Sequence, residues 1–219
     1  MIPEASADFV CQMEKVLDVY ARPYDPDHPV VNLDESPRQL ISEVREGFTD
    51  RQGVEYFDYE YAREGVADLY MILEAKAGRR EVLVKDNHNR FSYAEAIIHI
   101  ADEMYPEAEK ITLVEDNLSA HKLSALYEVL PPARARAIIE RIEVVRTPKH
   151  GSWLNVAELE LSVLTRQGLP RRVATKEALR QQVEAWYGQR NDKATRVDWQ
   201  FTTRDARIKL KRLYPKTQP

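Results

Sequence analysis

The sequence predicts an α/β protein with one mixed sheet, an antiparallel meander plus parallel strands, flanked by helices. Three observations support this class. Residues 54–85 form short apolar and aromatic runs separated by turns, which is typical of a meander. After residue 93, helical stripes alternate with short apolar runs, which is typical of parallel strands joined by helices. With 43% apolar and 31% charged residues among 219, the chain has a globular composition.

An amphipathic helix is expected first. Six apolar residues recur at helical spacing between Ser6 and Pro23: Phe9, Val10, Met13, Val16, Leu17 and Tyr20. The proline-containing stretch 22–26 breaks this pattern and predicts a stiff connector. We therefore assign residues 1–29 to a lead-in helix and linker, and residues 30–219 to the main domain.

The meander is expected next. Residues 30–36 are an apolar run that ends in acids, so they predict a strand with Asp34 at its carboxyl tip. Charged and helix-forming residues follow up to Asp50. Further strands are predicted at 54–61, 67–75 and 81–85, with turns at 63–65 and 77–79. The tyrosines of residues 54–61 either pack across strands, which we favour, or form platforms for base stacking.

The second half alternates between helices and strands. A buried strand at 111–114 ends on Glu115, Asp116 and Asn117. The other elements predicted, in chain order, are helices at 93–104, 120–130 and 133–141, a strand at 142–145, a helix after Asn155, and helices at 175–187 and 203–214.

Charge is unevenly distributed, although the net charge is only −4. Residues 1–133 carry 13 Lys and Arg against 27 Asp and Glu, whereas residues 134–219 carry 19 against 9. Two explanations are open at this point. The basic part could face a polyanion such as nucleic acid, or its helices could pair with acids elsewhere in the same fold.

Several function classes are disfavoured. The sequence lacks a run of roughly 18 apolar residues and a signal-peptide start, so a cytoplasmic protein without membrane contact is expected. A single cysteine, Cys11, excludes an internal disulfide, and the five histidines show no paired zinc spacing. There is no Gly-x-Ser-x-Gly elbow for a hydrolase and no glycine-rich phosphate loop. His121 in particular has no recognisable catalytic context.

Acids at the ends of strands indicate a different chemistry. Asp34 and Asp116 each end a predicted strand, and strands that end at one edge of a sheet can bring two carboxylates together. Their repulsion is relieved when a cation lies between them. Oxygen ligands of this kind suit Mg²⁺ or Mn²⁺.

Four blocks of the sequence carry a resemblance to a known family. They are residues 31–36 (VNLDES), 113–117 (LVEDN), 147–158 (TPKHGSWLNVAE) and 199–203 (WQFTT). In this order they resemble the DDE endonuclease domain of bacterial insertion-sequence transposases in the mariner superfamily, specifically the insertion sequence 630 group. The third block is the most specific of the four.

The resemblance implies a ribonuclease H-like fold and three catalytic, metal-binding acids at Asp34, Asp116 and Glu158. Helical geometry alone cannot separate Glu158 from Glu160, because both lie about equally far from the apolar arc of their helix. In the family motif, the catalytic glutamate is the third residue after an asparagine. That asparagine is Asn155 here, so the resemblance selects Glu158 over Glu160. We expect the three acids to converge within metal-bridging distance and Glu160 to lie outside.

The implied activity is DNA cleavage and strand transfer at transposon ends, with two Mg²⁺ or Mn²⁺ ions per site. The implied partners are transposon-end and target DNA, and a second copy of the chain during synapsis. Six basic residues near the third acid are candidate phosphate contacts: Arg146, Lys149, His150, Arg166, Arg171 and Arg172. Asn117, Trp153 and Asn155 are expected to support the site.

The chain also departs from the family pattern. Family members have helix-turn-helix DNA-recognition modules, which here would be separate or missing. Two other functions therefore remain open: a non-catalytic transposase remnant that binds DNA or protein, and a nuclease of the same fold that acts on RNA-DNA hybrids. A transposase would act in the bacterial cytoplasm, at the nucleoid.

Overall fold

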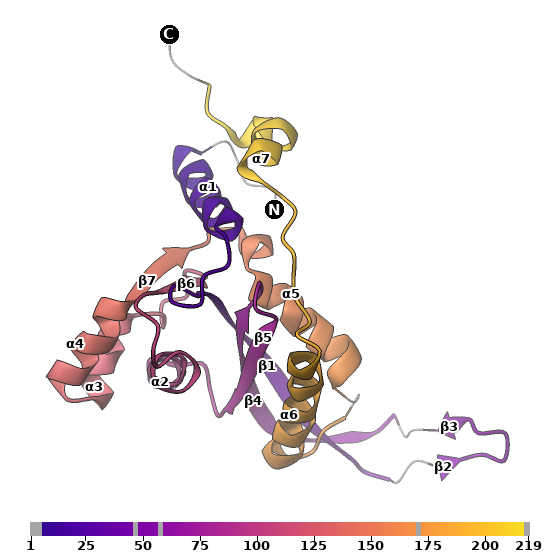
Figure 1. Cartoon of the computed structure of the whole chain (residues 1–219). Coiled ribbons are helices and arrows are strands. Elements are labelled where there is room, and N and C mark those ends of the chain that lie inside the picture. The colour runs from indigo at the N-terminus through magenta and orange to yellow at the C-terminus, as the bar shows by residue number, and fades with distance from the viewer. Residues whose placement is uncertain (1–5, 46–47, 57–58, 170–171, 217–219) are drawn as a thin grey trace.

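The computed structural model describes residues 6–45, 48–56, 59–169 and 172–216. Its five-stranded sheet consists of β1 Val30–Glu43, β4 Tyr61–Glu74, β5 Arg79–Lys85, β6 Ile111–Glu115 and β7 Ile142–Arg146. The strand order is β5-β4-β1-β6-β7 (Figure 1). β1, β4 and β5 pair antiparallel, whereas β1, β6 and β7 pair parallel. The mixed α/β class predicted from the sequence is confirmed.

The pairing of β1 determines where Asp34 lies. β1 pairs with β6 only through Val30, Val31 and Asn32, so beyond Asn32 no strand of the described residues pairs with it on that side, although the Ile41 amide hydrogen binds the Val173 carbonyl at 2.8 Å. It continues as an edge strand along β4, with Pro37 opposite Asp68. Proline is tolerated there because its missing N–H would face solvent and not a ladder.

The expectation that the strand ends at Asp34 is therefore wrong. Asp34 lies within a 14-residue strand, although it is next to the carboxyl end of β6. The charged residues after Asp34, up to Glu43, also form the strand because β4 pairs with them along their length. Pairing with a distant strand thus overrides their local helix propensity.

Two further strand predictions are wrong. Residues 63–65 do not turn: β4 passes through them with a bulge, where Leu40 pairs with Gly65 and Ile41 with Arg63. Gly65 adopts a φ of 124°, which other residues rarely reach. Of the strand expected at 54–61, Glu55–Tyr56 forms β3, paired with β2 Phe48–Thr49, and Tyr61 begins β4, while residues 57–58 lie outside the described residues. Tyr59 is 86% exposed, so it does not pack across strands.

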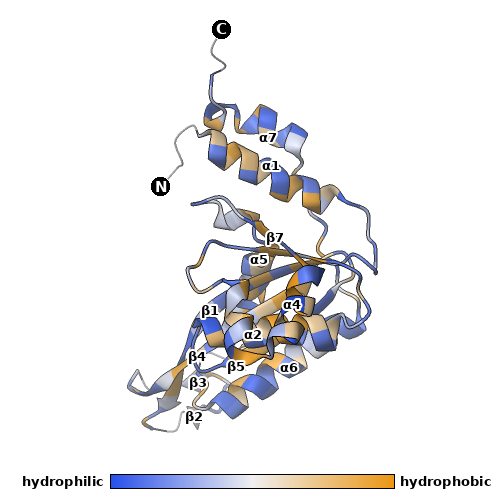
Figure 2. Ribbon diagram, turned by 90° about the vertical axis from the view of Figure 1, so that its left-hand side faces the viewer, coloured by the Kyte–Doolittle hydropathy of each residue, from blue (hydrophilic) through white to orange (hydrophobic). Residues whose placement is uncertain are grey.

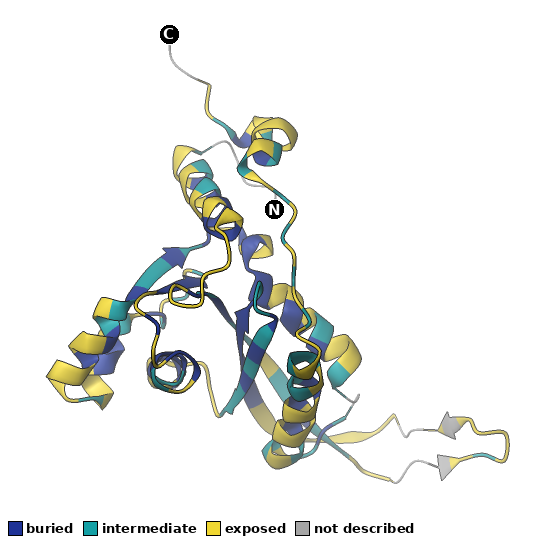
Figure 3. Ribbon diagram, viewed as in Figure 1, coloured by how far each residue is buried: buried dark blue, intermediate teal, exposed yellow. Residues whose placement is uncertain are grey.

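Helices cover both faces of the sheet (Figures 1 and 2). One core contains residues of α1 Ala7–Ala21, α5 Val156–Val163, α6 Lys176–Asp192 and α7 Thr203–Lys209. The other contains residues of α2 Arg90–His99, α3 Leu126–Val129 and α4 Pro132–Arg141. Figure 3 shows the strands in dark blue where they lie between the helices, and Figure 1 shows the β2–β3 ribbon projecting away from the helix-covered part of the sheet. The helix expected at 120–130 is shorter, because a 3₁₀ turn precedes α3.

The first and last helices lie side by side (Figure 1). Arg207 of α7 makes two hydrogen bonds to the Glu14 carboxylate of α1, at 2.9 and 2.8 Å, and Thr203 donates to Asp18. Lys176 likewise pairs with Asp86. Part of the basic surplus of the second half therefore pairs with acids of the first half. None of the helices in the described ranges has the length and apolar character of a membrane span.

Candidate active site

Asp34, Asp116 and Glu158 line one open cleft of about 440 Å³. Asp34 comes from β1, Asp116 directly follows β6, and Glu158 lies in the first turn of α5. The volume is many times the roughly 30 Å³ that one water occupies in the liquid, so hydrated ions and a phosphate group can enter. The other lining residues are Glu35, Ser36, Ser152, Asn155, Leu161, Ser162, Thr165 and Arg166.

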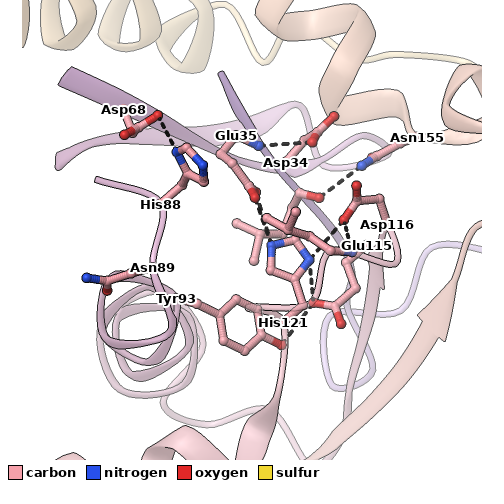
Figure 4. Close-up of polar contacts among 12 residues, drawn as sticks. Asp34, Glu35, Asp68, His88, Asn89, Tyr93, Glu115, Asp116, His121 and Asn155 are labelled. Atoms are coloured by element: carbon pink, nitrogen blue, oxygen red, sulfur yellow. Dashed lines mark hydrogen bonds and ion pairs between the residues drawn. The ribbon is translucent and has the colours of Figure 1, made fainter. Parts of the chain in front are cut away.

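Asn155 places the third acid. Its Oδ1 caps α5 by accepting the Ala157 amide hydrogen at 3.1 Å, and its Nδ2 donates to the Leu33 carbonyl at 2.9 Å (Figure 4). The start of α5 is thus tied to the residue before Asp34. This fixes Glu158, one turn into the helix, on the same side of β1 as Asp34.

The loop before α5 is closely packed. A side chain at Gly151 would meet Pro148 Cγ at 2.6 Å, so this loop leaves no room for a larger residue. Trp153 packs edge-to-face against Phe201, with ring centroids 5.9 Å apart. Asn117 donates its side-chain amide hydrogen to the Thr147 carbonyl, which joins the loops after β6 and β7. The expected supporting residues thus make contacts that shape the loops around the cleft.

The acids affect each other's ionisation. Burial raises the pKa of Asp34 to about 7, and the negative charges of Glu35, Asp116 and Glu158 add to this, although the Glu35 amide hydrogen bond opposes it. The pKa of Asp116 is instead lowered, mainly by its contact with His121. One carboxyl of the cleft is therefore readily protonated at neutral pH.

This donor set fits a hard divalent cation. The candidate ligands are carboxylate oxygens, which Mg²⁺ and Mn²⁺ prefer, and a cation would offset both the burial and the smaller charge repulsion that raise the pKa of Asp34. The predicted convergence within metal-bridging distance is not reached, however. Among the described residues, no three His, Cys, Asp or Glu side chains are gathered closely enough to hold an ion. The structure brings the three acids to one cleft but not into one cluster.

Glu160 lies elsewhere. Its side chain is 3% exposed, and Oε1 forms ion pairs with Arg80 Nε at 2.9 Å and Arg190 Nε at 2.8 Å. Arg80 of β5 is itself fully buried. Glu158 thus lines the cleft, whereas Glu160 neutralises a buried arginine in the core.

Glu160→Gln is expected to lower the free energy of unfolding by about 3 kcal/mol, because it leaves the buried Arg80 without its counter-charge. Urea unfolding measures this difference. Glu184→Gln, the same change at an exposed position of α6, is the matched control and should leave the midpoint unchanged. Equal midpoints for wild type and Glu160→Gln would contradict a structural role for the ion pair.

His121 is a site residue that the sequence did not reveal. It is 1% exposed, with Nδ1 3.0 Å from Asp116 Oδ1 and Nε2 3.0 Å from Glu35 Oε1 (Figure 4). Burial lowers the pKa of His121, but the contacts with Asp116 and Glu35 outweigh it and raise the pKa to about 10. At neutral pH the ring is therefore a cation between two acids. In the sequence, the only feature that linked His121 to the candidate site was that it follows Asp116 by five residues.

Glu115 is a second buried titratable residue next to the cleft. Its side chain is completely buried, accepts a hydrogen bond from the Tyr93 hydroxyl at 2.9 Å and pairs with Arg146 at 3.2 Å. Burial raises the pKa of Glu115 to about 7, against the charges of His121 and Arg146. This buried group lies behind the cleft, next to the His121 ring that contacts Asp116.

The residues predicted to contact DNA lie in different parts of the structure. Arg166 lines the cleft, and Lys149 and His150 are exposed in the loop before α5. Arg146 is engaged within the protein, since it also donates to the His121 carbonyl at 2.6 Å. Arg172 lies at the base of the ribbon, 3.6 Å from Glu43. Arg171 lies outside the described residues.

Comparison with known proteins identifies the family. The family model of DDE superfamily endonucleases matches residues 29–180. No curated protein sequence matches the chain.

Solved structures similar to this chain include the Mos1 mariner paired-end complex with Mn (15% identity, TM-score 0.56), which covers 88% of this chain. The Mos1 transposase paired-end complex with left transposon end (14%, 0.56) and the mariner Mos1 paired-end complex with Mg (14%, 0.55) cover 96% and 97%. The chain spans 58%, 63% and 63% of the lengths of these three proteins. The likeness confirms the ribonuclease H-like fold, and the family match covers more than half of the sequence. The chain belongs to the DDE superfamily endonucleases.

Proposed function

We propose that residues 30–219 are the catalytic domain of a transposase of the insertion sequence 630 group, which cuts DNA and transfers strands at transposon ends. One observation carries this proposal: Asp34, Asp116 and Glu158, from two strands and a helix, line a single cleft. The similar solved structures support it, because they are transposase complexes, one with a transposon end and others with Mn or Mg.

The three acids would hold two Mg²⁺ or Mn²⁺ ions. Bound, these ions supply the positive charge that activates a water or a DNA 3′-hydroxyl and stabilises the leaving oxygen. Asp34 gives up its proton on binding, because its raised pKa leaves it partly protonated near pH 7. Asn155 keeps Glu158 opposite Asp34. The reaction thus depends on positioning and charge more than on a protein nucleophile.

The DNA would run across the rim of the cleft beside α5. Arg166, which lines the cleft, and Lys149 and His150, which are exposed in the loop before α5, would bind phosphates, together with Arg171. Arg146 and Arg172 are weaker candidates, since both have acidic partners in the protein. We further propose that two copies act together on paired transposon ends, and that a separate helix-turn-helix module reads the end sequence.

Wild-type protein is expected to bind Mn²⁺ in calorimetry and to nick supercoiled DNA with Mn²⁺ or Mg²⁺, but not with EDTA. The reason is that the acids repel one another until cations neutralise them. An RNA-DNA hybrid of equal length is the comparison substrate. Cleavage of the hybrid without nicking of DNA would refute the transposase and favour a hybrid-specific nuclease. Mn²⁺ binding with neither activity would favour a non-catalytic remnant.

A further inference from the structure

The contacts of Asp116 distinguish its two carboxylate oxygens. Oδ1 accepts the Leu118 amide hydrogen at 2.8 Å and also faces Nδ1 of His121 at 3.0 Å. Oδ1 thus has one hydrogen bond, from Leu118, and one close ion pair, with His121, and both contacts hold it on the side of the His121 ring. We propose that His121 is a positioning residue that keeps Oδ1 engaged and so presents Oδ2 of Asp116 as the sole cation ligand of this side chain.

His121 is held firmly enough to do this. Its Nε2 lies 3.0 and 3.2 Å from the two oxygens of Glu35, and its ring stacks on Tyr93 with centroids 4.8 Å apart. Arg146 also binds its backbone carbonyl. Both ring nitrogens and one ring face are therefore engaged, so the imidazole cannot turn away from Asp116 without breaking several contacts.

His121 and its contacts with Glu35 and Asp116, here called the His121 bridge, connect β1 to the loop that follows β6. Glu35 follows Asp34 on β1, and successive strand residues point to opposite faces, so Glu35 reaches the α2 side while Asp34 faces α5. His121 follows β6 in the loop that begins with Asp116. By linking Glu35 to Asp116, it fixes the loop after β6 relative to the backbone of Asp34.

Other histidine–carboxylate pairs in the described chain do not have this arrangement. His99 binds Glu81 at 2.7 Å and His88 binds Asp68 at 3.0 Å, but none of these residues lines the cleft. The two carboxylates nearest to the His121 ring, Glu35 and Asp116, both line it. The His121 bridge is thus distinguished by what it connects, and this inference rests on the proposed function of the cleft.

The test compares wild type, His121→Gln and the control His99→Asn, which breaks a pair away from the cleft. The Gln amide replaces Nε2 and can keep the contact with Glu35, but it leaves no donor at the place of Nδ1 beside Asp116. In metal-free crystal structures, we expect the Asp116 carboxylate to turn in His121→Gln only. By calorimetry, the Kd for Mn²⁺ should rise about 10- to 100-fold in His121→Gln and stay unchanged in His99→Asn. His121→Asn, whose amide nitrogen takes the place of Nδ1 beside Asp116, should recover part of the affinity. Thermal unfolding of all variants shows that a loss of affinity is not a loss of fold.

A wild-type crystal soaked in Mn²⁺ tests the inference without any variant. Coordination by Oδ2 of Asp116 alone supports it, and coordination through Oδ1 overturns it. An Asp116 carboxylate that stays within about 0.5 Å of its wild-type place in His121→Gln, with an unchanged Kd, also overturns it. Absence of Mn²⁺ binding by wild type would refute the proposed function, while the metal-free structures would still decide whether His121 orients Asp116.

Discussion

Asp116→Asn and Glu158→Gln are each expected to lower Mn²⁺-dependent nicking of supercoiled DNA by at least about 100-fold. Each change removes a negative charge from the cleft but keeps the size of the side chain. The amide side chain in Asp116→Asn would retain an oxygen for the Leu118 amide hydrogen, so the loop after β6 should keep its shape. The measurement is the initial nicking rate at equal protein concentration, with thermal unfolding to verify the fold.

Glu184→Gln is the control for a lost charge outside the cleft and should nick DNA at the wild-type rate. The pair Glu158→Gln and Glu160→Gln then separates catalysis from stability. Glu158→Gln should lose nicking and keep stability, whereas Glu160→Gln should lose stability because it disrupts the buried pair with Arg80. A folded Glu160→Gln without nicking, next to an active Glu158→Gln, would show that the third acid is misassigned.

The sequence predicted those parts of the fold that depend on local pattern. The buried run 111–114 and the acids after it predicted β6 and the position of Asp116, because a short apolar run followed by polar residues marks the end of a buried strand. The length of β1 and the bulge at Gly65 could not be predicted, because both depend on pairing with a strand some thirty residues away.

The same limit applies to the site. The acids Asp34, Asp116 and Glu158 were predicted from the resemblance of a sequence motif, and Asp34 and Asp116 also from their positions after apolar runs. His121 was missed because its partner Glu35 is 86 residues away and becomes a neighbour only through the β1–β6 pairing. Helical geometry could not assign Glu160 for a similar reason: the arginine that it neutralises lies on β5.

Asp34→Asn is expected to stabilise the metal-free protein by up to about 4 kcal/mol at about pH 8, since one pKa unit corresponds to about 1.4 kcal/mol. The folded pKa of Asp34, about 7, lies above its ordinary value of 3.8, mainly because of burial. Between these values the folded state holds a proton that the unfolded state has lost, so the stability of the wild type falls as pH rises through this window. The penalty is complete above pH 7 and absent below about pH 4. Urea unfolding in EDTA at several pH values measures the difference between the two proteins.

Mn²⁺ provides the control, because a bound cation should remove the destabilisation that the buried, charged Asp34 carboxylate causes in the metal-free protein. At a concentration of 100 times its Kd, a ligand stabilises the folded state by about 2.7 kcal/mol, so Mn²⁺ should stabilise wild type but not Asp34→Asn. The variant would then lose most of its advantage when Mn²⁺ is present. A pH-independent difference, or an Asp34→Asn protein less stable than wild type in EDTA, would contradict this account. The expected pattern would mean that the buried negative charge of Asp34 lowers the stability of the metal-free fold and that the same charge is needed to bind the cation. Asp34 would then be a residue at which stability is given up for ligand binding.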